Sequence, residues 1–152
     1  MTTFSTASVP CSPASELPVE AIDRPIVFFD GVCGLCNSSV NWIISRDRAA
    51  VFRFSPLQGE TAAARLLQTD IENLNSMVLQ LHGRCFRKSS AFVRILWQLG
   101  PLEKLAGGLL WLIPKPLRDL GYGIVARNRY RWFGKKETCR LPTPQERARF
   151  LP

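Results

Sequence analysis

A short apolar strand that runs directly into a Cys-x-x-Cys pair constrains this chain more than any other feature. Residues 26–29 read Ile-Val-Phe-Phe, a β-branched and aromatic run typical of a buried strand. Asp30 and Gly31 end the strand, and Cys33 and Cys36 follow where apolar residues begin to recur at helical spacing. The pair is therefore predicted in the first turn of a helix, where free N–H groups and the helix dipole stabilise a thiolate. We interpret Cys33 as the exposed nucleophile and Cys36 as the buried resolving thiol.

The size and composition of the chain favour one globular domain. At 152 residues the chain can bury a core of its own, and 46% hydrophobic with 21% charged residues is an ordinary balance for such a domain. The longest apolar run, residues 105–113, is far shorter than the roughly 18 residues that span a bilayer. Residues 1–24 are rich in Ser, Thr and Pro and lack the pattern of a secretory signal. We expect a disordered tail over residues 1–24 and a single domain over residues 25–152.

The cysteines and the charges indicate the setting in which the protein works. Five scattered cysteines with one close pair do not resemble a secreted disulfide scaffold, so we expect a reducing compartment, the cytoplasm. Residues 84–152 hold 15 Lys or Arg against four Asp or Glu. Such a basic half can contact acidic partners or nucleic acid, although a solvated basic surface is the commoner arrangement. No cofactor and no metal are predicted.

The remaining pattern alternates strands with helices. Further strands are predicted near residues 51–54, 77–81 and 84–87. Helices are predicted from the cysteine pair to about residues 46–48, over residues 60–67, and from a cap at Ser89 or Ser90 to Leu99. A tight turn at His82 makes the last two strands a hairpin. The resulting order, β-α-β-α-β-β-α, is a thioredoxin-like α/β core with the dithiol where that fold keeps its active site.

Additional C-terminal helices are expected between about residues 101 and 139, one of them from Leu117 to about Ala126. Their apolar content predicts that they pack on the core, since a solvated appendage would not carry so many large side chains. The side chains expected to be buried are Leu109, Leu110, Trp111, Leu112, Ile113, Leu117, Leu120, Ile124 and Val125.

Several blocks of this sequence together resemble the DCC family of thiol-disulfide oxidoreductases, named for three letters carried here by Asp30, Cys33 and Cys36. The likeness starts at Ile26 and includes residues 52–58, 88–91 and 116–139. The resemblance implies a thioredoxin-like fold and a redox-active dithiol. Unlike ordinary thioredoxins, the chain has no Trp before Cys33 and no Pro directly before the third strand.

Candidate supporting residues come from both sides of the dithiol. The carboxylate of Asp30 could relay a proton to or from Cys36, or it could accept backbone N–H bonds and shape the turn. Lys88, Ser89 and Ser90 follow the returning fourth strand to the same end of the sheet as Cys33, and we expect them to contact substrate.

The C-terminal block contributes two further candidates. Cys139 has basic neighbours that favour a thiolate, so it is a candidate third redox thiol, with a structural thiol as the alternative. The basic and aromatic residues 127–134 could bind nucleic acid by stacking and phosphate contacts. We favour the alternative, in which Tyr130, Trp132 and Phe133 pack on the core and the arginines face water.

Two classes of function remain. The first is a thiol-disulfide oxidoreductase that acts on a disulfide-containing protein or a small-molecule thiol. The second is a non-catalytic thioredoxin-like module that binds an acidic partner or nucleic acid through its basic C-terminal face. A structural zinc site formed with His82 and Cys85 is the least favoured, because an antiparallel third strand places His82 at the far end of the sheet from Cys33.

Overall fold

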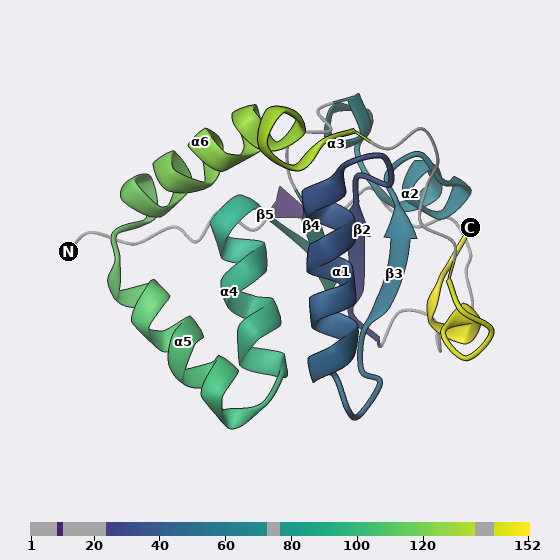
Figure 1. The fold of residues 1–152 in the computed structure, drawn as a ribbon, viewed down its shortest axis with the longest axis horizontal. Coiled ribbons are helices and arrows are strands. Elements are labelled where there is room, and N and C mark those ends of the chain that lie inside the picture. Colours follow the sequence, from purple (N-terminus) through teal and green to yellow (C-terminus); the bar gives the residue numbers. More distant parts are fainter. Residues whose placement is uncertain (1–8, 11–23, 73–76, 136–141) are drawn as a thin grey trace.

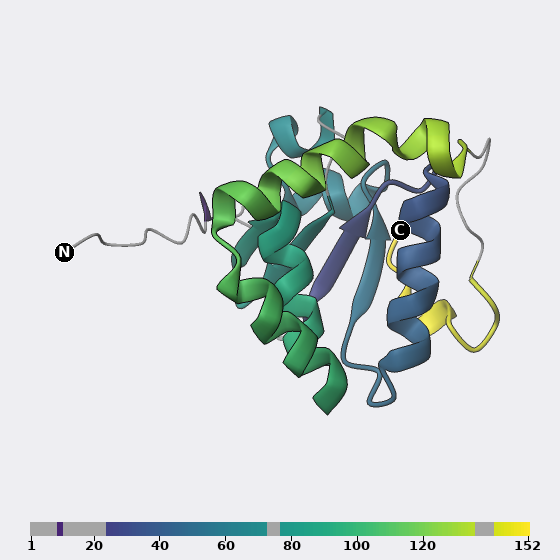
Figure 2. The same ribbon diagram turned by 60° about the vertical axis from the view of Figure 1, so that its left-hand side comes forward.

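The computed structural model describes residues 9–10, 24–72, 77–135 and 142–152, which form a mixed sheet with helices on both faces (Figures 1 and 2). The strands are β1 (Val9–Pro10), β2 (Ile26–Phe29), β3 (Arg53–Pro56), β4 (Val78–Leu81) and β5 (Arg84–Arg87). The helices are α1 (Gly34–Arg46), α2 (Glu60–Arg65), α3 (Gln68–Glu72), α4 (Lys88–Gln98), α5 (Pro101–Leu112) and α6 (Lys115–Phe133), and a 3-10 turn covers Arg147–Arg149.

Strand β2 lies inside the sheet, whose order is β1-β5-β4-β2-β3. It runs parallel to β3 and antiparallel to β4, and β4 forms an antiparallel hairpin with β5. Helix α1 makes the crossover that the parallel pairing of β2 and β3 requires. The arrangement confirms the predicted thioredoxin-like α/β fold with additional C-terminal helices.

The four residues of β2 are all buried, because helices cover both faces of the sheet at this strand. Val27 and Phe29 belong to the core beneath α1 and α4, whereas Ile26 and Phe28 belong to the core beneath α2. This alternation follows from the two-residue period of a strand. The C-terminal end of β2 therefore leads the chain directly towards Cys33 at the start of α1.

The strand predicted at residues 51–54 begins two residues later than expected. The carboxylate of buried Asp47 accepts hydrogen bonds from the backbone N–H groups of Val51 (3.0 Å from Oδ1) and Phe52 (2.9 Å from Oδ2). These bonds hold both residues in a loop, and pairing with β2 starts only beyond them.

The helix predicted over residues 60–67 is divided in two. Helix α2 ends at Arg65 because Leu66 has an extended backbone (φ −107°, ψ 158°), and α3 starts at Gln68. Helix α6, in contrast, extends seven residues beyond the predicted end at residue 126.

Helices α5 and α6 form an arm in which α5 packs on α4 and α6 lies across α4 and α1 (Figure 1). The predicted burial of their apolar side chains is wrong for most of them, since all but Leu110 of the nine are exposed. The residues that α5 buries are Glu103 and Gly107, and those that α6 buries are Arg118 and Arg129. The buried positions of both helices are thus small or charged, and most of their leucine side chains are exposed.

The described part of the predicted N-terminal tail consists of Val9–Pro10 and Arg24. Val9–Pro10 form β1, which pairs antiparallel with β5 at the edge of the sheet. The rest of residues 1–24 lies outside the described residues, and the proposed division into tail and domain stays a prediction. Within the described ranges, none of the helices combines the length and the apolar character needed to cross a membrane.

The C-terminal residues pack beside β3. Phe150 forms a parallel bridge with Phe54, and the Leu151 N–H donates to the Phe54 carbonyl at 2.8 Å. The Phe150 ring lies 5.5 Å from the ring of Phe54 and 6.4 Å from that of Phe29, measured between centroids. A segment far along the chain therefore completes the core beneath β2 and β3.

We expect Phe150→Ala to lower the free energy of unfolding by about 2–4 kcal/mol, because it removes a partly buried ring from two aromatic contacts. Urea titration followed by circular dichroism measures the loss. Phe133→Ala is the matched control, since that side chain is half exposed and its removal should cost under about 0.5 kcal/mol. Equal losses in the two variants would contradict the packing role of Phe150.

Candidate active site around Cys33 and Cys36

Cys33 is the N-cap residue of α1, with an extended backbone (φ −83°, ψ 125°), and Cys36 lies in the first turn of the helix. Both cysteines are free, and they lie 3.6 Å apart. The Cys33 carbonyl accepts the N–H of Asn37 at 3.0 Å, the first hydrogen bond of the helix. The pair thus lies at the predicted helix N-terminus, where backbone dipoles favour negative charge.

The exposure of the two cysteines is the reverse of the prediction. Cys33 is completely buried, whereas Cys36 keeps 7% of its surface exposed. The cause is the end of α6 and the residues after it: Lys135 forms an antiparallel bridge with Cys33, and the Gly34 N–H donates to the Gly134 carbonyl at 3.2 Å. Residues distant in sequence therefore close the solvent side of the first cysteine.

Two glycines permit this close approach. A Cβ at Gly34 would lie 2.3 Å from the carbonyl oxygen of Phe133, which is closer than any side chain allows. Gly134 adopts a positive φ of 78°, which turns the chain after α6 back over Cys33. The glycine inside the Cys-x-x-Cys pair is therefore required by a tertiary contact rather than by the helix.

Burial raises the pKa of the Cys36 thiol to about 12, and the charge of Cys33 and a thiol hydrogen bond with it act in the same direction. The positive charge of Arg129 and a backbone hydrogen bond from Asp30 partly oppose this rise. Cys36 consequently keeps its proton at neutral pH.

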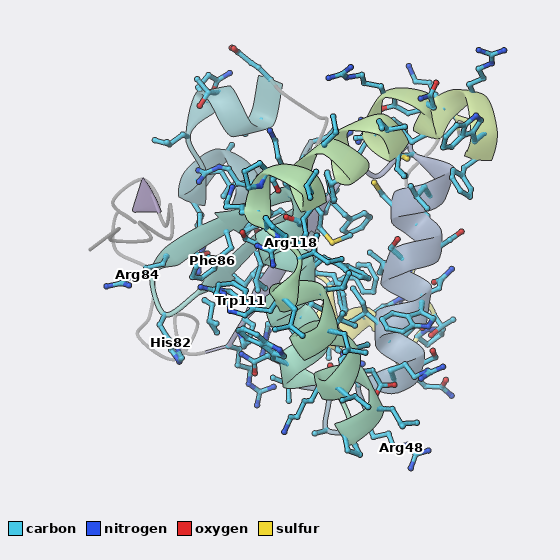
Figure 3. All side chains as sticks on the ribbon, turned by 90° about the vertical axis from the view of Figure 1, so that its left-hand side faces the viewer. Arg48, His82, Arg84, Phe86, Trp111 and Arg118 are labelled. Atoms are coloured by element: carbon cyan, nitrogen blue, oxygen red, sulfur yellow. The ribbon has the colours of Figure 1, made fainter. Side chains whose placement is uncertain are left out.

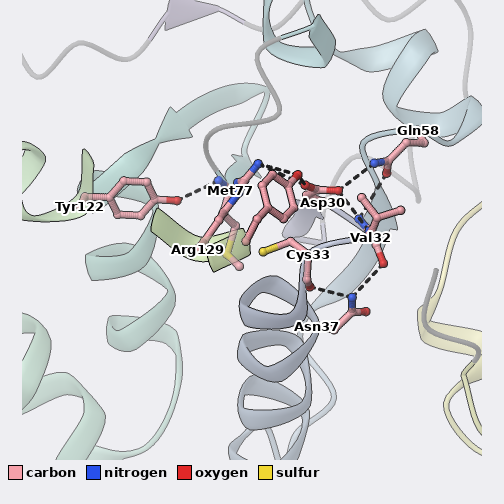
Figure 4. A network of polar contacts seen from close by, with 10 residues as sticks. Asp30, Val32, Cys33, Asn37, Gln58, Met77, Tyr122 and Arg129 are labelled. Atoms are coloured by element: carbon pink, nitrogen blue, oxygen red, sulfur yellow. Dashed lines mark hydrogen bonds and ion pairs between the residues drawn. The ribbon is translucent and has the colours of Figure 1, made fainter. Parts of the chain in front are cut away.

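Asp30 is the centre of a buried polar network that joins the turn before Cys33 to α6 (Figure 4). Its Oδ2 accepts from the Arg129 Nη2 at 3.1 Å and from the hydroxyl of Tyr130. Its Oδ1 accepts from the Gln58 Nε2 at 2.9 Å and from the Val32 N–H at 3.1 Å. Both carboxylate oxygens are thus occupied in holding the turn and the helix together.

The amide of Asn37 fixes the same turn from the side of α1. Its Nδ2 donates to the carbonyls of Gly31 and Cys33, at 2.8 Å in each case, and the residue is buried. On the other side, the Tyr122 hydroxyl of α6 accepts the Met77 N–H at 2.9 Å (Figure 4). The backbone just before β4 is therefore already bonded to α6.

A cavity of about 470 Å³ opens beside Cys36 between α1, α4, α5 and α6. Its lining residues are Leu35, Cys36, Ser39, Met77, Lys88, Ser89, Phe92, Val93, Leu110, Ile113, Leu117, Arg118, Gly121, Tyr122, Val125, Ala126 and Arg129. Lys88 and Ser89 thus share a cavity wall with Cys36, and Ser90 does not line it. The predicted role of these three residues in substrate binding stays a prediction.

The other candidates from the sequence do not join the site. The register of β2 against β4 pairs Ile26 with Gln80, so the His82 turn lies at the opposite end of the sheet from Cys33, as predicted. Cys85 is a buried, disulfide-bonded residue of β5. Among the described residues, no group of His, Cys, Asp and Glu could hold a metal ion. Cys139 lies outside the described residues.

The sequence model of the DCC1-like thiol-disulfide oxidoreductases matches residues 27–135, a span that contains the dithiol and most of its contacts. The chain belongs to the DCC1-like thiol-disulfide oxidoreductase family. The resemblance that the blocks around Asp30, Cys33 and Cys36 indicated is thereby confirmed.

Two relatives of this DCC1-like chain are similar over most of their length. A protein of Bacillus subtilis (strain 168), named uncharacterized protein YuxK, is 40% identical over 136 residues, which cover 88% of this chain and 98% of the relative. A chloroplastic DCC family protein of Arabidopsis thaliana is 38% identical over 121 residues, 78% of this chain and 70% of the relative. No solved protein structure matches the chain.

The residues of the DCC1-like site that come from α6 were not predicted from the sequence. The prediction that the arginines of residues 127–134 face water is wrong for Arg129, which is buried against Asp30. Trp132 and Phe133, predicted to pack on the core, are exposed, while Tyr130 packs against the core as predicted. Arg129 and Gln58 lie in blocks that resemble the family, but nothing local to either residue indicates a partner 99 or 28 positions away.

We expect Arg129→Met to lower the free energy of unfolding by about 3–5 kcal/mol, because it leaves the buried carboxylate of Asp30 without its ion-pair partner. Arg131→Met, an exposed position on the same helix, is the control and should cost under about 0.5 kcal/mol. In a double-mutant cycle with Asp30→Asn, the combined loss should be smaller than the sum of the single losses. Additive losses would show that the pair is not coupled.

We expect Gly34→Ala to uncover Cys33, because the added Cβ must displace the Phe133 carbonyl. The variant should lose about 1–3 kcal/mol of stability, and alkylation of Cys33, followed by peptide mass spectrometry, should become faster. Gly108→Ala is the control, since a Cβ there meets no atom within 4 Å. An unchanged alkylation rate in Gly34→Ala would contradict the covering role of residues 133–135.

Proposed function

We propose that this chain is a thiol-disulfide oxidoreductase in which Cys33 attacks a disulfide and Cys36 resolves the product. The observation that carries the proposal is the pair of free cysteines 3.6 Å apart at the N-terminus of α1. Membership of the family supports the same reaction class. The substrate class that we propose is a disulfide-containing protein or a small-molecule thiol or disulfide.

The different surroundings of the two sulfurs support these roles. The Cys33 thiolate, at the helix N-terminus, attacks one sulfur of the substrate disulfide and releases the other as a thiolate. Cys36, whose thiol is kept protonated by burial, then gives up its proton and attacks the Cys33 sulfur. The second substrate thiolate leaves, two electrons have passed to the substrate, and Cys33 and Cys36 share a disulfide. An external thiol must reduce that disulfide to restore the starting state.

We propose that Asp30 acts as a positioning residue rather than as the proton relay. Its carboxylate oxygens already accept hydrogen bonds from Val32, Gln58, Arg129 and Tyr130. Those bonds hold Arg129 close enough to Cys36 for its charge to lower the pKa of that thiol. The carboxylate thereby places the cation that eases deprotonation of the resolving cysteine.

Access to Cys33 requires movement of the residues that follow α6. The backbone of Lys135 bridges that of buried Cys33, the Gly134 carbonyl accepts the Gly34 N–H, and the Tyr122 hydroxyl accepts the Met77 N–H. A substrate must displace residues 134–135, and we propose that this step limits the reaction with large disulfides. Because, among the described residues, only one backbone bridge, between Lys135 and Cys33, has to break, residues 134–135 can move without the unfolding of α6.

The basic C-terminal face supports the second candidate function, a module that binds an acidic partner. Arg127, Arg131 and Lys135 are exposed together with Trp132 and Phe133. This face does not need the dithiol, so loss of both cysteines should leave such binding intact.

The compartment stays a prediction: scattered cysteines favour a reducing one such as the cytoplasm, whereas the disulfide at Cys85 favours an oxidising one.

Thiol labelling tests the assignment of the two cysteines. We expect iodoacetamide to label Cys33 before Cys36 at mildly acidic pH, although Cys36 is the more exposed, because the raised pKa of Cys36 keeps that thiol in its protonated, unreactive form. With its pKa at about 12, Cys36 should react about tenfold faster for each unit of pH between 7 and 10. Preferential labelling of Cys36 at low pH would reverse the roles.

A trapping experiment in the same preparation tests the reaction. Cys36→Ser should accumulate a mixed disulfide through Cys33 when mixed with an aromatic disulfide, and Cys33→Ser should not. A wild-type chain that forms no Cys33–Cys36 disulfide across a series of glutathione redox buffers would overturn the proposed function.

A further inference from the structure

The cavity beside Cys36 has the size and the walls of a small-molecule site. Its volume of about 470 Å³ falls within the roughly 300–1,000 Å³ usual for ligand pockets. Phe92 and Val93 of α4 and Leu110 of α5 give it an apolar wall, and Cys36 contributes one side. The exposed side chain of Leu117 borders the cavity on α6, where an apolar ligand could enter.

One wall of this apolar cavity carries a buried guanidinium with two nitrogens that, among the described residues, make no hydrogen bond. Arg118 is only 9% exposed, and within the described part of the chain its Nε and Nη1 have no hydrogen-bond partner. Its guanidinium lies 5.1 Å from the centre of the Trp111 ring, where α6 and α5 face α4 (Figure 3). A buried cation without an anion is costly, so a ligand that supplies the anion gains strongly.

The groups around Arg118 leave its charge uncompensated. Lys88 and Arg129 also line the cavity, and burial together with the charge of Arg118 lowers the pKa of nearby Arg94. The nearest carboxylate on α6, Asp119, is already bonded to Lys115 and to the Ser89 hydroxyl. The excess of positive charge therefore faces the cavity.

The backbone conformation at the first residue of α4 places two polar residues at the cavity wall. Lys88 adopts a positive φ of 55°, a conformation that costs free energy in a residue with a side chain. It directs the chain from β5 into α4 so that Lys88 and Ser89 both reach the cavity wall.

We propose that this cavity binds a small amphiphile with a single anionic group, such as a medium-chain carboxylate. The anion pairs with the free nitrogens of Arg118, and the apolar body lies between α4 and α6 against Cys36. This site goes beyond the proposed thiol chemistry and does not rest on it, since a Cys33→Ser, Cys36→Ser chain keeps the cavity wall and the guanidinium.

Isothermal titration of the full chain with eight-carbon ligands tests the proposal. Octanoate and octyl phosphate should each bind at least about tenfold more tightly than octanol or octylamine, because only the anions pair with Arg118. Acetate should not bind measurably, since it lacks the apolar body. Equal affinity for octanoate and octanol would overturn the assignment of Arg118, and strong binding of acetate would overturn the amphiphilic site. A preference between the two anions identifies the headgroup, carboxylate or phosphate.

Two matched pairs of variants locate the site. Gly121→Phe places a ring at the cavity wall and should reduce octanoate affinity at least about tenfold, whereas Gly123→Phe, outside the cavity, should not. A Cβ meets no atom within 4 Å at either glycine, so both variants should fold, and thermal unfolding checks this.

Arg118→Gln should abolish the preference for octanoate over octanol, Arg118→Lys should keep part of it, and exposed Arg127→Gln should leave it unchanged. Octanoate binding that survives both Gly121→Phe and Arg118→Gln would overturn the proposal.

Discussion

The buried ion pair between Asp30 and Arg129 is the interaction on which the arrangement of this site depends. It joins residues 99 positions apart, the turn after β2 and the last part of α6. Both side chains are almost fully removed from water, a state that is tolerable only when the charges face each other and further hydrogen bonds complete them. The Tyr130 hydroxyl, the Gln58 amide and the Val32 N–H provide those bonds. The long α6 is thereby held against the dithiol rather than left as an appendage.

The position of α6 gives the two cysteines different environments. Beyond its last residue, Gly134 and Lys135 close over Cys33, and Gly34 leaves room for them. Earlier residues of α6 contact α4 through the bond between Asp119 and Ser89, and the cavity that reaches Cys36 is lined by residues of both helices. Cys33 is therefore buried beneath residues 134–135, and Cys36 lies beside an apolar cavity. A minimal thioredoxin-like core without α5 and α6 would have neither feature.

The elements that were predicted well are those with strong local patterns. Strand β2 is continuously apolar and buried, and the β4–β5 hairpin has its turn signal at His82 and Gly83. The prediction failed for α5 and α6 because it counted apolar residues without their direction. In those helices Glu103, Gly107, Arg118 and Arg129 face inward. Most of the leucines are exposed, although Leu110 lines the cavity. A count of apolar side chains cannot show which face a helix presents to its neighbours.

By itself the sequence determined the thioredoxin-like order of elements, the family and the place of Cys33 and Cys36 at the start of a helix. The order of elements and the place of the two cysteines follow from period, turn residues and spacing, which act over a few residues. The family followed from the resemblance of several separate sequence blocks. Only the tertiary structure decided that Cys33 is buried and that Arg129 is the partner of Asp30. It also decided that two nitrogens of Arg118, beside the cavity, lack a hydrogen-bond partner among the described residues. Each of these depends on where α6 docks, and docking is set by contacts between side chains that are far apart along the chain.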